Sequence, residues 1–175
     1  MASLGEEFLT FSATKLRELE ARVETCLGRL SEEQIWARGK ENENAAGNLV
    51  LHLCGNVNQW IVSTIGGRPD TRVREREFSA RGGASKAELT ERLRVTVEEA
   101  LRVIGGLNAN SLTPRHTIQG YDVSVLEAIY HVVEHFSMHT GQIIFITKLL
   151  TTEDLGFYRH LDPTPNLAAS PPQRA

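Results

Sequence analysis

Hydrophobic residues recur in steps of three and four along four segments of the chain, which is the spacing of one face of an α-helix. Each segment is long enough for several helical turns, and polar residues fill the positions between the hydrophobic ones. The pattern therefore predicts four long helices, over residues 9–30, 45–65, 85–107 and 125–150.

Helix-start signals accompany this pattern. In a capping box, a Ser side chain accepts a hydrogen bond from the third helical N–H, and a Glu or Gln at that position bonds back to the Ser backbone. Three segments match this arrangement, beginning at Ser31, Ser85 and Ser124. The first predicts a short helical turn that carries Trp36, and Asn44 is the predicted N-cap of the second long helix.

The segments between the predicted helices are long and polar. Residues 68–83 alternate Arg with Asp or Glu and end in two glycines, which predicts a long surface loop. Residues 108–121 exceed the median loop length of about 4–6 residues and can cross one end of a helical bundle. No segment has the two-residue period of a strand, so we predict an all-α, four-helix bundle with one or two long crossovers over residues 1–160. The Pro-rich residues 161–175 are predicted to form a mobile tail.

Composition and charge narrow the function. With 175 residues the chain has the length of one domain, and 19 Lys and Arg against 22 Asp and Glu give no basic excess for nucleic-acid binding. No apolar run reaches the roughly 20 residues that span a bilayer, and residues 1–10 lack the basic and apolar pattern of a signal peptide. These features predict a cytoplasmic protein in which Cys26 and Cys54 are buried, reduced thiols.

Histidines carry the candidate chemistry. His135 and His139 lie four residues apart in the fourth predicted helix, so their imidazoles project to one side at the spacing of helical metal sites. His52 lies on a core-leaning face of the second helix and is the candidate third ligand. Neutral imidazole nitrogens suit Zn, Ni, Co, Cu or Fe, and Asn56 and Gln142 are candidate hydrogen-bond partners of the ligands. Hydrogen-bonded histidines without a metal are the alternative.

A second motif overlaps the first. Residues 131–135 read His-Val-Val-Glu-His and match the His-x-x-Glu-His pattern of inverted zinc proteases, in which Glu134 would be the general base. Such a site also needs an acidic ligand downstream, and the residues that follow are few and mostly polar or Pro-rich. We therefore interpret His131 as a residue of the pocket wall or a partner of the ligands.

At these residues the sequence resembles a known superfamily. Residues 44–56, the loop with Arg72, Arg74, Glu77 and Phe78, and residues 135–143 look like the DinB/YfiT-like superfamily, specifically its DinB-like branch. The resemblance covers nearly the whole chain to about residue 161. One departure is Ala45, where many relatives have Ser at the helix start.

The resemblance has implications for fold, ligands and assembly. It implies an up-down-down-up four-helix bundle, commonly a homodimer, with a divalent metal held by His52, His135 and His139. Characterised relatives include transferases and isomerases that use mycothiol, bacillithiol or glutathione, and many members have no known reaction.

The chemistry of a three-histidine site follows from the uncompensated positive charge of the ion that it would bind. Three neutral ligands leave at least one coordination position open, as in catalytic sites. An ion there lowers the pKa of bound water from 15.7 to about 7 and deprotonates a coordinated thiol. The function predicted first is transfer of a low-molecular-weight thiol to an electrophilic small molecule. The alternatives are a metal-dependent hydrolase and a non-catalytic protein that binds a metal or a small molecule.

The Arg-rich stretch offers a further candidate. Residues 68–81 hold five Arg against three acidic residues, a local positive excess in an acidic protein. Arg72 and Arg74 are candidates for binding an anionic cosubstrate, because a guanidinium forks onto carboxylates well. The alternative is a solvated surface without a ligand.

Overall fold

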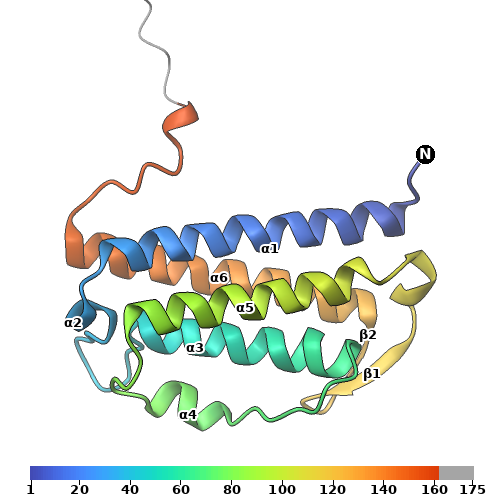
Figure 1. Ribbon diagram of the computed structural model, residues 1–175, viewed down its shortest axis with the longest axis horizontal. Coiled ribbons are helices and arrows are strands. Elements are labelled where there is room, and N and C mark those ends of the chain that lie inside the picture. The colour runs from blue at the N-terminus through green and yellow to red at the C-terminus, as the bar shows by residue number, and fades with distance from the viewer. Residues whose placement is uncertain (162–175) are drawn as a thin grey trace, which may run out of the picture.

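Four long helices lie side by side (Figure 1). The structure is a computed structural model that describes residues 1–161. The long helices are α1 (Leu4–Arg29), α3 (Ala46–Val57), α5 (Lys86–Gly105) and α6 (Val125–Thr151). The π-helix η1 (Asn58–Ile65) continues α3, and the shorter elements are α2 (Glu32–Ile35), α4 (Arg74–Ser79), η2 (Ala109–Leu112), β1 (Arg115–Ile118), β2 (Tyr121–Ser124) and η3 (Arg159–Leu161).

The helices follow an up-down-down-up order. Helices α1 and α6 run in one direction, and α3 and α5 run in the other (Figure 1). Both α1 and α3 pack against α5 and against α6, which closes the bundle. The chain returns along the bundle between η1 and α5, and this long crossover carries α4. The predicted four-helix bundle with long crossovers is confirmed.

The predicted hydrophobic faces form the core. Side chains from all four long helices are fully buried there, among them Leu16, Leu53, Leu93 and Phe136. The three predicted capping boxes are present, and a fourth at Ser3 starts α1 earlier than the hydrophobic pattern predicts. The apolar period therefore specifies the four long helices, and capping boxes mark the starts of α1, α5 and α6.

The prediction of a surface loop over residues 68–83 is wrong in its middle. Residues Arg74–Ser79 form α4, which packs against α3. Glu77 is only 7% exposed, and the Arg72 side chain is only 4% exposed. The two side chains form an ion pair. A charged pair can be buried when each partner satisfies the other, so the polarity of this stretch does not place all of it in solvent.

The connection between α5 and α6 contains a β-hairpin, so the prediction of a chain without strands is also wrong. Strands β1 and β2 pair antiparallel, with Ile118 opposite Tyr121. The two residues between them, Gln119 and Gly120, have φ angles of 53° and 85°. Positive φ at both central residues is the geometry that matches the twist of a two-residue hairpin.

The start of α3 differs from the prediction. Its N-cap is Ala45 rather than Asn44, and Ala45 has no side chain that could cap the helix. The Asn48 side chain forms only the return half of a capping box, because its Oδ1 accepts a hydrogen bond from the Ala45 backbone N–H at 3.2 Å. The N–H groups of the first turn of α3 therefore receive no hydrogen bond from an N-cap side chain.

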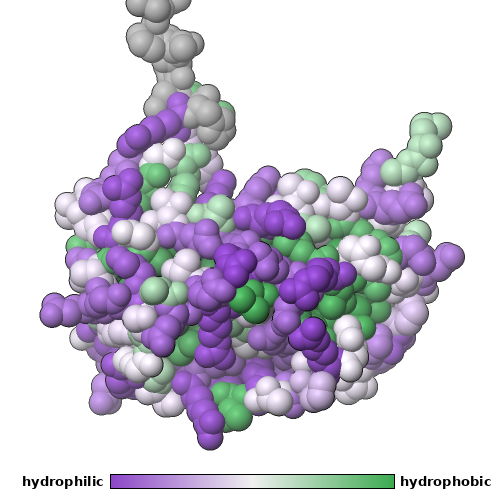
Figure 2. Space-filling model, in the orientation of Figure 1, coloured by the Kyte–Doolittle hydropathy of each residue, from purple (hydrophilic) through white to green (hydrophobic). Residues whose placement is uncertain are grey.

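Figure 2 shows one face of the molecule, on which hydrophilic residues predominate and smaller hydrophobic areas lie among them. Among residues 1–161, no helix combines the length and the apolar character that crossing a membrane requires. The predicted mobile tail falls almost wholly on residues 162–175, outside the described part of the chain.

Glu20 of α1 yields a stability prediction. Burial, reinforced by the nearby Glu24 and Glu98, raises the pKa of Glu20 from its ordinary 4.5 to about 7. The folded state therefore disfavours the ionised carboxylate and loses stability as the pH rises from about 4.5 through 7. Discounted for solvent screening, Glu20→Gln is expected to raise the free energy of unfolding by about 1 kcal/mol at pH 8 and hardly at pH 4.5. Urea unfolding at the two pH values measures this, and an equal gain at both would refute it.

Candidate metal site

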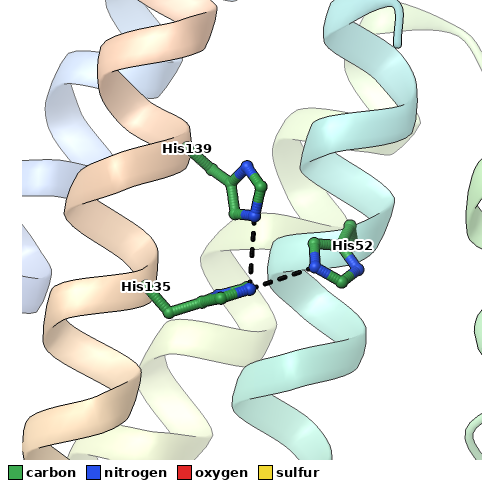
Figure 3. A group of neighbouring side chains, drawn as sticks. All are labelled: His52, His135 and His139. Carbon is green, nitrogen blue, oxygen red and sulfur yellow. Dashed lines mark hydrogen bonds between the residues drawn. The ribbon is translucent and has the colours of Figure 1, made fainter. Parts of the chain in front are cut away.

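Three histidines from two helices converge beside the core. His52 projects from α3, and His135 and His139 project from α6 toward it (Figure 3). The Nε2 atom of His135 lies 3.1 Å from Nε2 of His52 and 3.2 Å from Nε2 of His139. The three ligand nitrogens all lie within 4.8 Å of one another. The structure thus brings together the three histidines that the sequence singles out, in a cluster that could hold a metal ion.

The outer nitrogens of two imidazoles have acceptors. Nδ1 of His52 lies 2.8 Å from Oε2 of Glu77, and Nδ1 of His139 lies 2.6 Å from Oε1 of Gln142. Oε2 of Glu77 and Oε1 of Gln142 are acceptors, so the proton is assigned to Nδ1 of each ring. Nη2 of Arg72 also lies 3.1 Å from Nδ1 of His52, but it donates to the same Glu77 oxygen at 2.9 Å. The lone pair of each Nε2 then faces His135.

His135 cannot satisfy both of these lone pairs. A neutral imidazole has one proton, so Nε2 of His135 can donate to only one neighbour. Its Nδ1 is buried and has no hydrogen-bond partner among the described residues. With the proton on Nδ1, three Nε2 lone pairs face each other, and a shared cation would satisfy all three at once.

The spacing of the nitrogens fits a transition-metal ion. Metal–nitrogen bonds of about 2.0–2.1 Å separate adjacent ligand nitrogens by about 2.8–3.4 Å, from octahedral to tetrahedral geometry. The two Nε2–Nε2 distances of 3.1 and 3.2 Å lie inside this interval. Two of the three nitrogen separations therefore match such an ion, and the third lies within 4.8 Å.

Burial disfavours the charged form of the two histidines of α6. Burial, followed by the neighbouring imidazoles of His139 and His52, lowers the pKa of His135 to about 3. Burial also lowers the pKa of His139 and outweighs the opposing hydrogen bond from Gln142. Neutral imidazoles are the form that binds a metal.

Glu77 anchors His52 from outside the cluster. Burial alone would raise the pKa of Glu77, but hydrogen bonds from Arg72 and His52 outweigh it and hold the pKa below its ordinary value. Arg72 donates through Nε and Nη2 to the two Glu77 oxygens, at 2.8 and 2.9 Å. A carboxylate that accepts from the outer nitrogen of a ligand histidine fixes the ring and its tautomer. No motif spacing links Glu77 to His52, so its place at the site could not be predicted from the sequence.

Gly55 leaves the space that Glu77 occupies. A Cβ built on Gly55 would lie 1.9 Å from Oε1 of Glu77 and 2.9 Å from Nε of Arg72. Gly55 lies three residues after His52, on the same face of α3. Only glycine at this position therefore leaves room for the Arg72–Glu77 ion pair beside α3, the helix that carries His52.

The other candidate residues occupy different places. Asn56 is 3% exposed, and its Oδ1 has no hydrogen-bond partner among the described residues. His131 stacks on Trp60, with ring centroids 4.1 Å apart, and is not a member of the three-histidine group. Glu134 is exposed. The residues of the His-x-x-Glu-His pattern therefore do not converge on one point.

A cavity of about 440 Å³ lies beside the histidines. The π-helix η1 contributes Trp60 to its wall, and the hairpin contributes Gln119 from its turn and Tyr121 and Val123 from β2. π-Helical turns are frequent at functional sites, because they change the direction of side chains on an otherwise regular helix. The lining residues are His52, Asn56, Trp60, Arg72, Arg74, Gln119, Tyr121, Val123, His131 and His135.

Comparison with protein families places the chain among its relatives. The model of a family of proteins of unknown function, DUF1572, matches residues 3–159. The chain belongs to the DUF1572 family. In this DUF1572 chain the matched span contains the three histidines, Glu77 and Gln142. Comparison with curated proteins gives no match.

Proposed function

We propose that this chain is a divalent-metal-dependent enzyme of the DinB/YfiT-like kind that transfers a low-molecular-weight thiol to an electrophilic small molecule. The observation that carries the proposal is the convergence of three Nε2 lone pairs, with the outer nitrogens of His52 and His139 held by Glu77 and Gln142. Three neutral protein ligands leave an open coordination position, which is typical of catalytic rather than structural sites. When bound, a divalent ion would supply the positive charge that deprotonates a coordinated thiol or water.

The protein's own residues hold the ligands and shape the space for a substrate. Glu77 fixes the ring of His52, and Gln142 fixes the ring of His139, so both Nε2 atoms stay directed at the same point. Trp60 and His131 form a stacked wall beside this point. A preformed cavity next to pre-oriented ligands favours a reaction on a small molecule over a purely structural metal.

The cysteines of the chain favour an external thiol. Cys26 and Cys54 are both buried, and burial raises the pKa of Cys54 to about 11. Neither residue lines the cavity beside the histidines. A buried thiol with a raised pKa is a poor nucleophile, so the thiol of the proposed reaction comes from solution. Hydrolysis by activated water is the second candidate, because it requires the same three ligands.

The test is a turnover assay on zinc- or nickel-loaded protein. An activated aryl halide is supplied with glutathione, cysteine or mycothiol, and an activated ester is supplied without thiol. We expect thiol-dependent turnover that falls at least about 100-fold in His52→Ala and after treatment with a chelator, with helical circular dichroism unchanged. His116→Ala, a histidine of β1 outside the cluster, is the matched control and should retain full activity.

Two outcomes would contradict the thiol proposal. Equal turnover of the ester with no thiol present would assign the activity to water and make the protein a hydrolase. Equal turnover by wild type and His52→Ala would show that the three-histidine cluster does not support the reaction.

A further inference from the structure

The geometry points to a substrate class: we propose that the cavity beside the histidines binds a small carboxylate with a flat apolar body, and that Arg74 binds the carboxylate. The inference deepens the proposed function and rests on it, since it assigns a substrate to the same site. It also gives Arg72 and Arg74 different roles, although both are equal candidates for anion binding from the sequence alone.

The first line of evidence for an anionic ligand is the charge of the cavity lining. The lining contains two Arg and no Asp or Glu. Arg72 is already engaged, because its guanidinium bonds both oxygens of Glu77 and also Oε1 of Gln59. Arg74 forms no ion pair with any residue in the described part of the chain. The cavity therefore has an uncompensated positive charge that favours an anion.

Arg74 is also held in a defined position. Its guanidinium carbon lies 4.9 Å from the centroid of the Phe78 ring, within range of a cation–π contact. Phe78 in turn packs against His52, with ring centroids 4.6 Å apart. A guanidinium that is stacked on a ring keeps its N–H groups free at the edge, where a carboxylate can accept two of them.

The second line of evidence, for a flat apolar body, is the kind of side chain that forms the cavity walls. Trp60 and His131 stack on each other, and the hairpin adds Tyr121 and Val123. Trp60 itself is only 3% exposed, so His131, Tyr121 and Val123 offer most of the flat or apolar surface, which suits an aromatic or conjugated ligand. A volume of about 440 Å³ is within the range of about 300–1,000 Å³ for small-molecule sites.

The position of the histidines relative to Arg74 sets the orientation of the ligand. His52 and His135 line the same cavity as Arg74. A carboxylate on Arg74 thus leaves the remainder of the ligand beside the three-histidine cluster. Arg74 is in this view a specificity residue that selects anionic substrates and fixes which end reaches the cluster.

A neighbouring cavity shows what distinguishes this one. It lies across Arg72, has a volume of about 460 Å³, and is lined by Arg68, Arg76 and Arg92 among others. Asp70, Glu77 and Glu99 line it as well, and Arg68 pairs with Glu99 at 2.7 Å. Four Arg and three acidic residues line it, so it also has a positive excess, but none of the three clustered histidines lines it.

The experiment compares a carboxylate with its uncharged amide. Binding of 2-naphthoate and 2-naphthamide to full-length, zinc-loaded protein is measured by isothermal titration calorimetry, together with the zinc content of each sample. We expect the carboxylate to bind about tenfold more tightly than the amide. Arg74→Gln should remove this preference by weakening the carboxylate about tenfold while leaving the amide within about twofold. Arg76→Gln, two residues further along α4, is the matched control and should preserve the preference.

A metal-free arm separates Arg74 from the ion. If Arg74 binds the carboxylate, the preference and its loss in Arg74→Gln persist after zinc is removed. A preference that vanishes with the zinc, equal binding of the two compounds by wild type, or an unchanged preference in Arg74→Gln would each overturn the inference. A full zinc content with no carboxylate preference counts against this inference alone, whereas failure of wild type to bind zinc counts against the proposed function.

Discussion

Replacing His135 by alanine is expected to abolish tight binding of a divalent cation. His135 is the centre of the cluster, since its Nε2 is the atom within 3.1 and 3.2 Å of both other Nε2 atoms. Without it, His52 and His139 provide only two ligands, one from each of two helices, and we expect the affinity to fall more than about 100-fold. Competition with a chromophoric zinc chelator measures the affinity, and elemental analysis measures the content.

His131→Ala is the matched control, because this residue lies one turn before His135 on α6 and lines the same cavity. Its ring stacks on Trp60 rather than pointing into the cluster, so metal affinity should stay within about threefold of wild type. The reverse pattern, with binding lost in His131→Ala and kept in His135→Ala, would refute the ligand assignment and favour the His-x-x-Glu-His interpretation.

Gly55→Ala is expected to weaken metal binding although Gly55 is not a ligand. The new Cβ would lie 1.9 Å from Oε1 of Glu77, so the carboxylate must move. His52 then loses the acceptor that fixes its Nδ1–H and the direction of its Nε2. Loss of such a partner costs about 10–100-fold in metal affinity, and we expect a loss in this range.

Gly141→Ala provides the comparison for this substitution. Gly141 lies in helix α6 close to His139, but a Cβ there meets nothing within 4 Å. Alanine is a better helix former than glycine, so this variant should gain about 1 kcal/mol of stability and bind metal as wild type does. If Gly55→Ala also bound metal as wild type does, the Glu77 contact would not be needed to position His52.

The parts of the fold that follow from local pattern could be predicted. The spacing of apolar residues shows which face of a helix is buried, so it predicts all four long helices, and capping boxes mark the starts of α5 and α6. His135 and His139 could be paired because four residues bring side chains together on any helix. His52 followed from its place on a core-leaning face, although nothing local connects α3 with α6.

The remaining features depend on contacts between distant segments. Glu77 lies in a polar stretch whose composition predicts solvent, and its burial depends on pairing with Arg72 and His52 in the folded chain. The hairpin strands have four residues each, too few for a two-residue period to stand out. Its turn at Gln119 and Gly120 is the local signal that could have been found, since glycine readily adopts the required positive φ.

The central claim is that His52, His135 and His139 hold one divalent cation. The most direct test is the metal content of full-length, untagged protein, loaded with zinc or nickel and freed of excess ion by gel filtration. Elemental analysis against protein concentration is predicted to give about one equivalent per chain, because three convergent neutral imidazoles bind such ions tightly. Less than about a tenth of an equivalent after loading would contradict the account.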